Sequence, residues 1–116
     1  MSLTSNPSLT VIFRDANNYP VVTTICSDAD IYDLIGYGAI RVTQVDDDVL
    51  AISRADAYDN DEPVTITHSY SEDDVLCIRH IYGDVIIVGY DPENDEAVSL
   101  NSYQLSRWLF THEDLE

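Results

Sequence analysis

The sequence predicts a single α+β domain with a mostly antiparallel sheet of five to six strands and two to three short helices. Three observations support this class. The chain has 116 residues, which is close to the commonest size of one domain. Short runs of β-branched residues are separated by turns rich in Asp, Asn and Gly. Segments 28–35 and 102–111 instead repeat their apolar residues with the period of a helix.

The strands are expected where apolar and polar residues alternate. Residues 16–19 resemble a hairpin turn between the first two strands, and the triplet 46–48 separates the next two. Segment 85–90 is continuously apolar, which predicts a central strand buried on both faces. The predicted strands are 8–15, 20–26, 39–45, 49–54, 64–68, 85–90 and 97–100.

The first helix is predicted over 28–35. Ser27 stands where an N-cap is needed, and Asp30 three residues later resembles the second member of a capping box. Gly36 or Gly38 is expected to end the helix, because glycine adopts the left-handed conformation that follows many helices.

The last helix is predicted over 102–111, with Asn101 or Ser102 as its cap. Its inward face is expected to carry the large apolar residues Leu105, Trp108 and Leu109.

Segment 71–82 fits either a helix or a strand, and we favour a helix. Ser71 is followed three residues later by Asp74, acids occupy the first turn, and Gly83 could stop the helix. Three apolar residues then share one helical face: Val75, Ile78 and Tyr82.

Charge is the property that departs most from the average protein. The chain has 22 acidic and 5 basic residues, a net charge of −17, and no lysine at all. Among the acids Asp outnumbers Glu by 16 to 6. In molar salt the repulsion between carboxylates is screened, and short Asp side chains keep the surface hydrated without the long apolar stem of Lys. The composition resembles that of proteins from halophilic archaea and their viruses.

DNA mimicry is the alternative account of the acidity. In a mimic, carboxylates imitate the phosphates of a duplex and occupy the cleft of a nucleic-acid enzyme, as in inhibitors of the anti-restriction or anti-CRISPR type. The acidic clusters here fall between apolar segments, at turn positions where Asp is favoured for local hydrogen bonding. We therefore interpret them first as solvated turns.

Two acidic clusters are weak candidates for cation binding. Asp91, Glu93 and Asp95 have the alternate spacing of a calcium loop, but Glu96 stands where an EF-hand needs Gly. The second cluster consists of Asp46, Asp47 and Asp48. Any cation bound there is expected to be held nonspecifically, and no cofactor is predicted.

The cysteines and histidines give no paired zinc signature. Cys77 and His80 have a metal-ligand spacing, but Cys26 and His68 do not form a second pair with matching spacing. We expect two buried free thiols and a core or boundary role for His80.

Catalytic motifs are missing from the sequence. It has no Gly-x-Ser-x-Gly, and without lysine it cannot form a P-loop or a Schiff base. The net charge should repel phosphates, and the five arginines are too scattered in sequence to suggest a basic patch. We predict a protein that is not an enzyme and does not bind nucleic acid directly.

From Asp28 to Phe110 the succession of a short helix, a two-strand meander, the strand YGDVIIVGYD and the helix NSYQLSRWLF resembles a family of uncharacterised small domains carried by phages, plasmids and some archaea. The resemblance implies a mobile-element origin and no particular activity.

No signal peptide or membrane span is recognised, so a cytoplasmic protein is expected. Residues 1–7 are expected to be disordered, and 115–116 are interpreted as a remnant of an expression vector. The function predicted is that of a non-catalytic, salt-adapted accessory or interaction protein of a halophilic archaeon or its virus, and another protein is the partner class considered.

Overall fold

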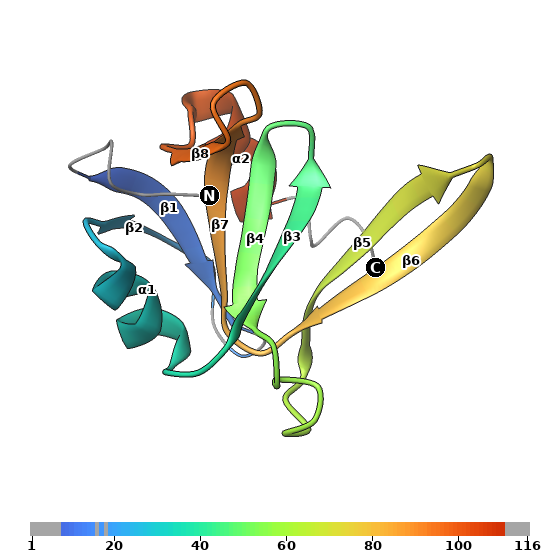
Figure 1. Ribbon diagram of the computed structural model, residues 1–116, viewed down its shortest axis with the longest axis horizontal. Coiled ribbons are helices and arrows are strands. Elements are labelled where there is room, and N and C mark those ends of the chain that lie inside the picture. Colours follow the sequence, from blue (N-terminus) through green and yellow to red (C-terminus); the bar gives the residue numbers. More distant parts are fainter. Residues whose placement is uncertain (1–7, 16, 18, 111–116) are drawn as a thin grey trace.

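The computed structural model describes residues 8–15, 17 and 19–110. An antiparallel six-stranded sheet with two helices forms the body, and a separate two-stranded hairpin projects from it (Figure 1). The predicted class, α+β with a mostly antiparallel sheet, is therefore confirmed. No helix in the described part of the chain is long and apolar enough to cross a membrane.

The body sheet joins strands from both halves of the chain. Its members are β1 (Leu9–Arg14), β2 (Val21–Ile25), β3 (Ile40–Asp46), β4 (Val49–Arg54), β7 (Val85–Asp91) and β8 (Glu96–Val98). Their order is β2-β1-β7-β4-β3, with β8 also paired to β7, and every pair is antiparallel. The last strand is shorter than the 97–100 expected and begins one residue earlier.

Strand β7 lies at the centre because both of its faces are buried. Ile86 and Val88 pack into a core on one face of the sheet, while Val85 and Ile87 pack into a second core on the other. Side chains alternate between the two faces of a strand, so a strand covered on both sides must be apolar throughout. Burial of both faces therefore explains why the sequence of this strand is apolar at consecutive positions.

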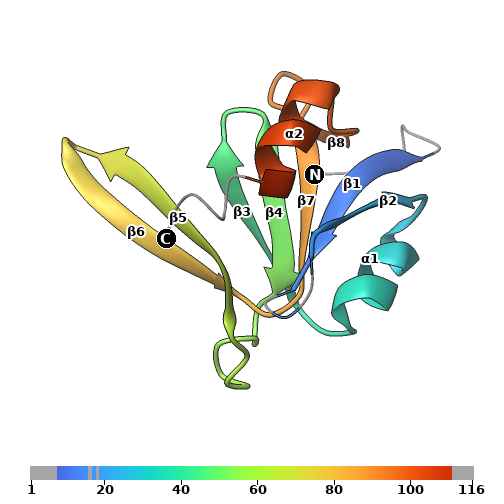
Figure 2. The ribbon, with the colours of Figure 1, turned by 180° about the vertical axis from the view of Figure 1, so that it is seen from behind.

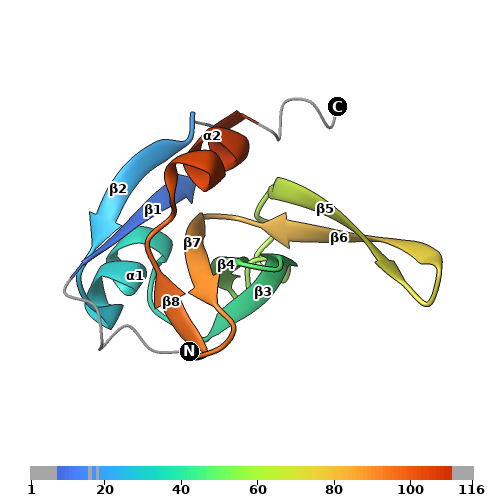
Figure 3. The same cartoon turned by 90° about the horizontal axis from the view of Figure 1, so that it is seen from above.

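The two helices cover opposite faces of the sheet (Figures 2 and 3). Helix α1 (Asp28–Ile35) has the predicted bounds and buries Ile31 and Ile35 in the first core. Helix α2 (Ser102–Phe110) buries Trp108 in the second core, with Leu105 and Leu109 packed against it. The inward face predicted for the last helix is thus confirmed.

The cap of α1 differs from the prediction. Ser27 is the N-cap, but its side chain makes no capping hydrogen bond. Instead the carboxylate of Asp30 accepts a hydrogen bond of 2.6 Å from the backbone N–H of Cys26. Gly36 ends the helix as predicted. Its φ of +93° and ψ of 157° lie outside the left-handed helical region, in a conformation that is essentially open only to glycine.

A reciprocal capping box begins α2. The Asn101 side chain accepts from the Gln104 N–H, and the Gln104 side chain accepts from the Asn101 N–H, both at 2.9 Å. Of the two caps that the sequence allowed, Asn101 is therefore the one used.

Segment 71–82 is not a helix, and this prediction was wrong. Strand β5 runs from Val64 to Glu72 and β6 from Val75 to Tyr82, and the two form the projecting hairpin. The turn residues Asp73 and Asp74 have φ of +51° and +64°, the positive values that a two-residue type I′ turn requires. Asp tolerates this conformation better than most residues, so the acids taken for a helix start instead form the turn of a hairpin.

The first hairpin also forms as predicted, with β1 antiparallel to β2. Residues 16 and 18 of its turn lie outside the described residues, as do the segments 1–7 and 115–116 on which disorder and a vector remnant were predicted.

Candidate functional site

Most of the projecting hairpin lies outside the two cores of the body, so the packing of the body does not explain its presence. At its base Ile66 and Ile81 are opposite each other and buried in the second core. Farther out the strands leave the body, as Figures 1 and 3 show from two directions. Three large apolar side chains of β6 are exposed there: Val75 at 60%, Leu76 at 69% and Ile78 at 60%.

One face of the hairpin carries the aromatic rings of His68 and Tyr70 and the guanidinium of Arg79. The register places His68 opposite Arg79 and Tyr70 opposite Cys77. The His68 and Tyr70 rings stack with centroids 5.6 Å apart, and the Arg79 guanidinium carbon lies 4.6 Å from the centre of the Tyr70 ring. These contacts stiffen a two-stranded ribbon that would otherwise be marginally stable.

His68 links this face to the body. Partial burial lowers the pKa of its imidazole, and the nearby positive charge of Arg79 lowers it further. The backbone of Val45 and the carboxylate of Asp46 oppose this change. The lowered pKa favours the neutral ring at pH 7, which suits its stacking on Tyr70.

The opposite face of the hairpin carries Leu76 and Ile78, with Ser71 and Ser69 across the strand pair. His80 lies on this face with its Nδ1 atom 3.2 Å from the Thr67 hydroxyl. Both outer edges of the hairpin are unpaired among the described strands, since β5 and β6 pair only with each other. Unpaired strand edges with exposed apolar side chains are surfaces on which another strand can add.

Three of the five arginines gather beside the base of β6. Arg41, Arg54 and Arg79 line a small hollow together with His80, and we call this the arginine hollow. Its walls also include residues of β3, β4 and the following loop. The fold thus brings to the lining of one hollow arginines that lie far apart in the sequence. That the chain does not bind nucleic acid directly stays a prediction.

Arg54 is the best-anchored member of the arginine hollow. Its Nη2 atom lies 2.6 Å from an Asp56 carboxylate oxygen. Gly36 makes room for the guanidinium, since a Cβ there would lie 3.3 Å from Nη1.

In the candidate cation cluster of Asp46, Asp47 and Asp48, the Asp46 carboxylate is engaged by contacts within the protein. Asp46 forms a 2.6 Å ion pair with Arg107 and accepts from the Asp47 N–H at 2.9 Å. Asp47 and Asp48 are exposed at the same turn.

The candidate cation cluster of Asp91, Glu93 and Asp95 forms a hydrogen-bonded turn between β7 and β8. Asp91 accepts from the Glu93 N–H and from the Asn94 amide, and these bonds lower the pKa of its carboxyl. Asp95 accepts a 2.8 Å hydrogen bond from the Tyr90 hydroxyl. Within the described residues, no three Asp, Glu, His or Cys side chains are grouped to hold a metal ion. Weak cation binding therefore stays a prediction.

Cys77 and His80 do not form a ligand pair, because on a strand residues three apart point to opposite faces. His80 is exposed, so the core or boundary role expected for it was wrong. Both cysteines are free as predicted, but Cys26 is exposed and Cys77 half-buried, so the expected burial was also wrong.

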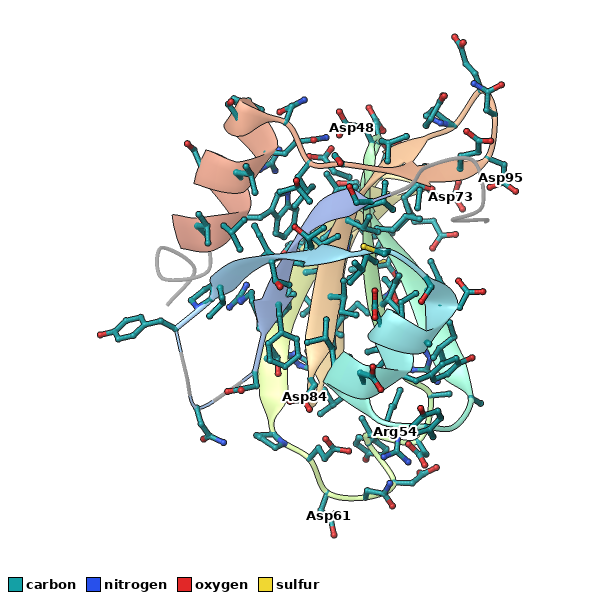
Figure 4. The ribbon with its side chains drawn as sticks, turned by 90° about the vertical axis from the view of Figure 1, so that its left-hand side faces the viewer. Asp48, Arg54, Asp61, Asp73, Asp84 and Asp95 are labelled. Atoms are coloured by element: carbon teal, nitrogen blue, oxygen red, sulfur yellow. The ribbon has the colours of Figure 1, made fainter. Side chains whose placement is uncertain are left out.

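The acidic side chains are spread over the molecule. Figure 4 shows Asp48 and Asp95 toward one end of the sheet and Asp61 and Asp84 toward the other. Further acids lie on α1 and at the hairpin turn.

Comparison of the chain with models of protein families, with curated proteins and with solved structures finds no significant match.

Sequence reasoning missed the projecting hairpin as a candidate site, although one signal was present. Residues 75–82 are rich in Val, Ile and Tyr, which favour strands, and follow an Asp-Asp pair, a combination typical of a hairpin turn followed by a strand. The arginine hollow has no such local signal, since its members come from three separate segments.

Proposed function

We propose that this chain is a non-catalytic, salt-adapted protein that binds another polypeptide through its projecting hairpin. The observation that carries the proposal is the combination of unpaired strand edges with Val75, Leu76 and Ile78 exposed on the same ribbon. Proteins usually protect such edges with charges, proline or a covering element, because they favour association. At this hairpin the acids are confined to the turn, so the apolar stretch behind it stays accessible.

The spread of the carboxylates supports salt adaptation over DNA mimicry. A phosphate mimic needs its acids along one strip, with about one charge per 1.7 Å of duplex axis. The acids here occupy turns at both ends of the sheet, helix α1 and the hairpin turn. A halophilic archaeon or its virus is the origin that this distribution favours, and DNA mimicry stays the alternative.

Affinity capture in concentrated salt tests the binding role. The chain would be immobilised and exposed, at about 2 M KCl where long-range repulsion is screened, to an extract of the cells that encode it. We expect the double variant Leu76→Asp/Ile78→Asp to lose polypeptides that the wild type retains.

Val21→Asp/Val22→Asp is the matched control, since it places the same two charges at 54% and 45% exposed positions on the edge strand β2. Retention of the same polypeptides by the hairpin variant would contradict the proposal. Inhibition of a nuclease by the chain at low salt would instead support DNA mimicry.

A further inference from the structure

We infer that the polypeptide bound by the hairpin is a second copy of this chain, paired edge to edge along β6 about a two-fold axis at Cys77. The two hairpins would then form one four-stranded antiparallel sheet. This inference rests on the proposed function and adds to it the identity of the partner.

The backbone of β6 is arranged for this pairing. In a hairpin with a two-residue turn, the pair next to the turn is hydrogen-bonded, and bonded and non-bonded pairs then alternate. Here Glu72 and Val75 are that first pair. The backbone N–H and C=O groups of Leu76 and Ile78 therefore point away from β5, toward the outer edge where a second strand can bond to them.

The side chains select one register. With the axis at Cys77, Leu76 of each copy lies opposite Ile78 of the other, so the exposed apolar residues of one face cover each other. An axis at Leu76 would place Ile78 opposite the Asp74 carboxylate, and an axis at Ile78 would place Leu76 opposite His80. Of these three registers, only the one centred on Cys77 places both Leu76 and Ile78 opposite apolar residues.

The polar side chains at the two ends of the paired segment also match. In this register Asp74 lies opposite His80 of the other copy, and Asp73 lies opposite Ile81. Each acidic turn thus arrives at the base of the other hairpin, where Arg79 and His80 line the arginine hollow. The apolar match and the pairing of Asp74 with His80 therefore agree on one arrangement.

Formation of this dimer should depend on the salt concentration. Two copies that each carry a net charge of −17 repel each other strongly in dilute buffer. In molar salt the Debye length falls to about 3 Å, and only groups in direct contact still interact. The paired edges form a small interface, less than the ~1,200 Å² of a stable standard-size complex, so we expect a reversible dimer with a Kd on the order of 10–100 μM.

Disulfide trapping tests the register directly. Opposed residues of a non-bonded pair have Cα atoms about 4.5 Å apart, which is within the range of a disulfide. The variant Cys26→Ser, which keeps only Cys77, would be treated with diamide in about 2 M NaCl. Two thiols would join through one S–S bond, and diamide would take up their two protons and two electrons.

The matched control is Cys77→Ser, which keeps only Cys26. Cys26 is the more exposed thiol, so random collisions would cross-link it faster. We expect the opposite order, with Cys77 cross-linking at least tenfold faster. Equal rates, or faster linkage of Cys26, would overturn the two-fold pairing.

Sedimentation equilibrium in the same salt tests the dimer without oxidation. Ile78→Asp places a carboxylate opposite Leu76 twice in the symmetric dimer, so we expect its Kd to rise at least tenfold, while Val22→Asp leaves the Kd unchanged. Circular dichroism would verify that both variants are folded.

A wild-type chain that stays monomeric up to about 1 mM, well above the expected Kd, would refute the inference. If the hairpin variant had nonetheless lost a different polypeptide in the capture experiment, the proposed binding role would stand and only the second copy would be excluded.

Discussion

The folded state should be strongly stabilised by salt, and the size of the effect follows from the charge and dimensions of the chain. The radius of gyration is 13.6 Å. Two charges then lie about 19 Å apart on average, and at ~0.01 M salt each like pair repels by about 0.1 kcal/mol. A net charge of −17 makes about 140 such pairs, so the repulsion in the folded state is roughly 15 kcal/mol.

Unfolding relieves most of this repulsion. An unfolded chain of this length has a radius of gyration of about 35 Å, so its charges repel by only about 2 kcal/mol at the same salt concentration. At ~1 M salt both energies nearly vanish. Salt should therefore raise the free energy of unfolding by on the order of 10 kcal/mol, which is comparable with the whole stability of a typical domain.

Thermal melts followed by circular dichroism at about 0.01, 0.2 and 2 M NaCl span these screening regimes. The midpoint should rise by at least ~20 °C across the series. A cooperative melt with an unchanged midpoint would refute the reasoning from charge.

A charge-reduced variant separates screening from other effects of salt. Six exposed carboxylates can be neutralised with little change of shape, which lowers the net charge to about −11. Because repulsion scales with the square of the charge, the midpoint should then rise less than half as much. An equal rise in both proteins would assign the effect to something other than charge. The substitutions are Asp33→Asn, Asp47→Asn, Asp48→Asn, Asp59→Asn, Asp61→Asn and Glu93→Gln.

Three further predictions concern individual side chains. Burial raises the pKa of Asp84, and the carboxylates of Asp15 and Glu62 raise it further. The charged carboxylate is thus disfavoured in the folded state and destabilises the fold at pH 7. This destabilisation is lost as the pH falls through the raised pKa. Asp84→Asn should therefore raise the melting midpoint at pH 7 but not near pH 4, and an equal gain at both pH values would contradict this cause. Gln104→Ala removes one of the two capping-box hydrogen bonds of α2 and the 3.2 Å hydrogen bond to the Asp48 carbonyl. Urea unfolding should show a loss of about 1–2 kcal/mol, whereas the exposed Ser106→Ala should change little. Ca²⁺ added to the chain should bind weakly at several sites and be displaced by NaCl; calorimetry that found one stoichiometric site in molar salt would mean that one Asp cluster is an organised cage.

Regular local patterns let the sequence predict most of the body. Helix α1 was placed at its exact bounds, because an apolar stripe between Ser27 and Gly36 leaves little freedom. The centre of the sheet was recognised because only a strand buried on both faces is apolar at every position. Such features can be predicted because each depends on whether a face of the segment is buried. They do not depend on which other segments bury it.

The projecting hairpin was assigned wrongly because the local signals were balanced. Ser71, Asp74 and the spacing of Val75 and Ile78 suit a helix, and the Val, Ile and Tyr residues of the same stretch also suit a strand. A tertiary contact favours the strand over the helix. Ile66 and Ile81 pack together in the second core, and this contact holds β6 extended beside β5. A contact between segments this far apart in the sequence leaves no periodic trace in either one.

The sequence by itself determined the fold class, the number and position of most elements, and the extreme negative charge, since each follows from local residue types summed along the chain. Tertiary structure alone decided where the charges and the remaining apolar side chains lie. It exposed Leu76 and Ile78 on an unpaired edge and gathered Arg41, Arg54 and Arg79 in one hollow. The physical reason is that a surface is made by segments that meet only after the core has packed, and surface residues bury too little area to impose a pattern on the sequence.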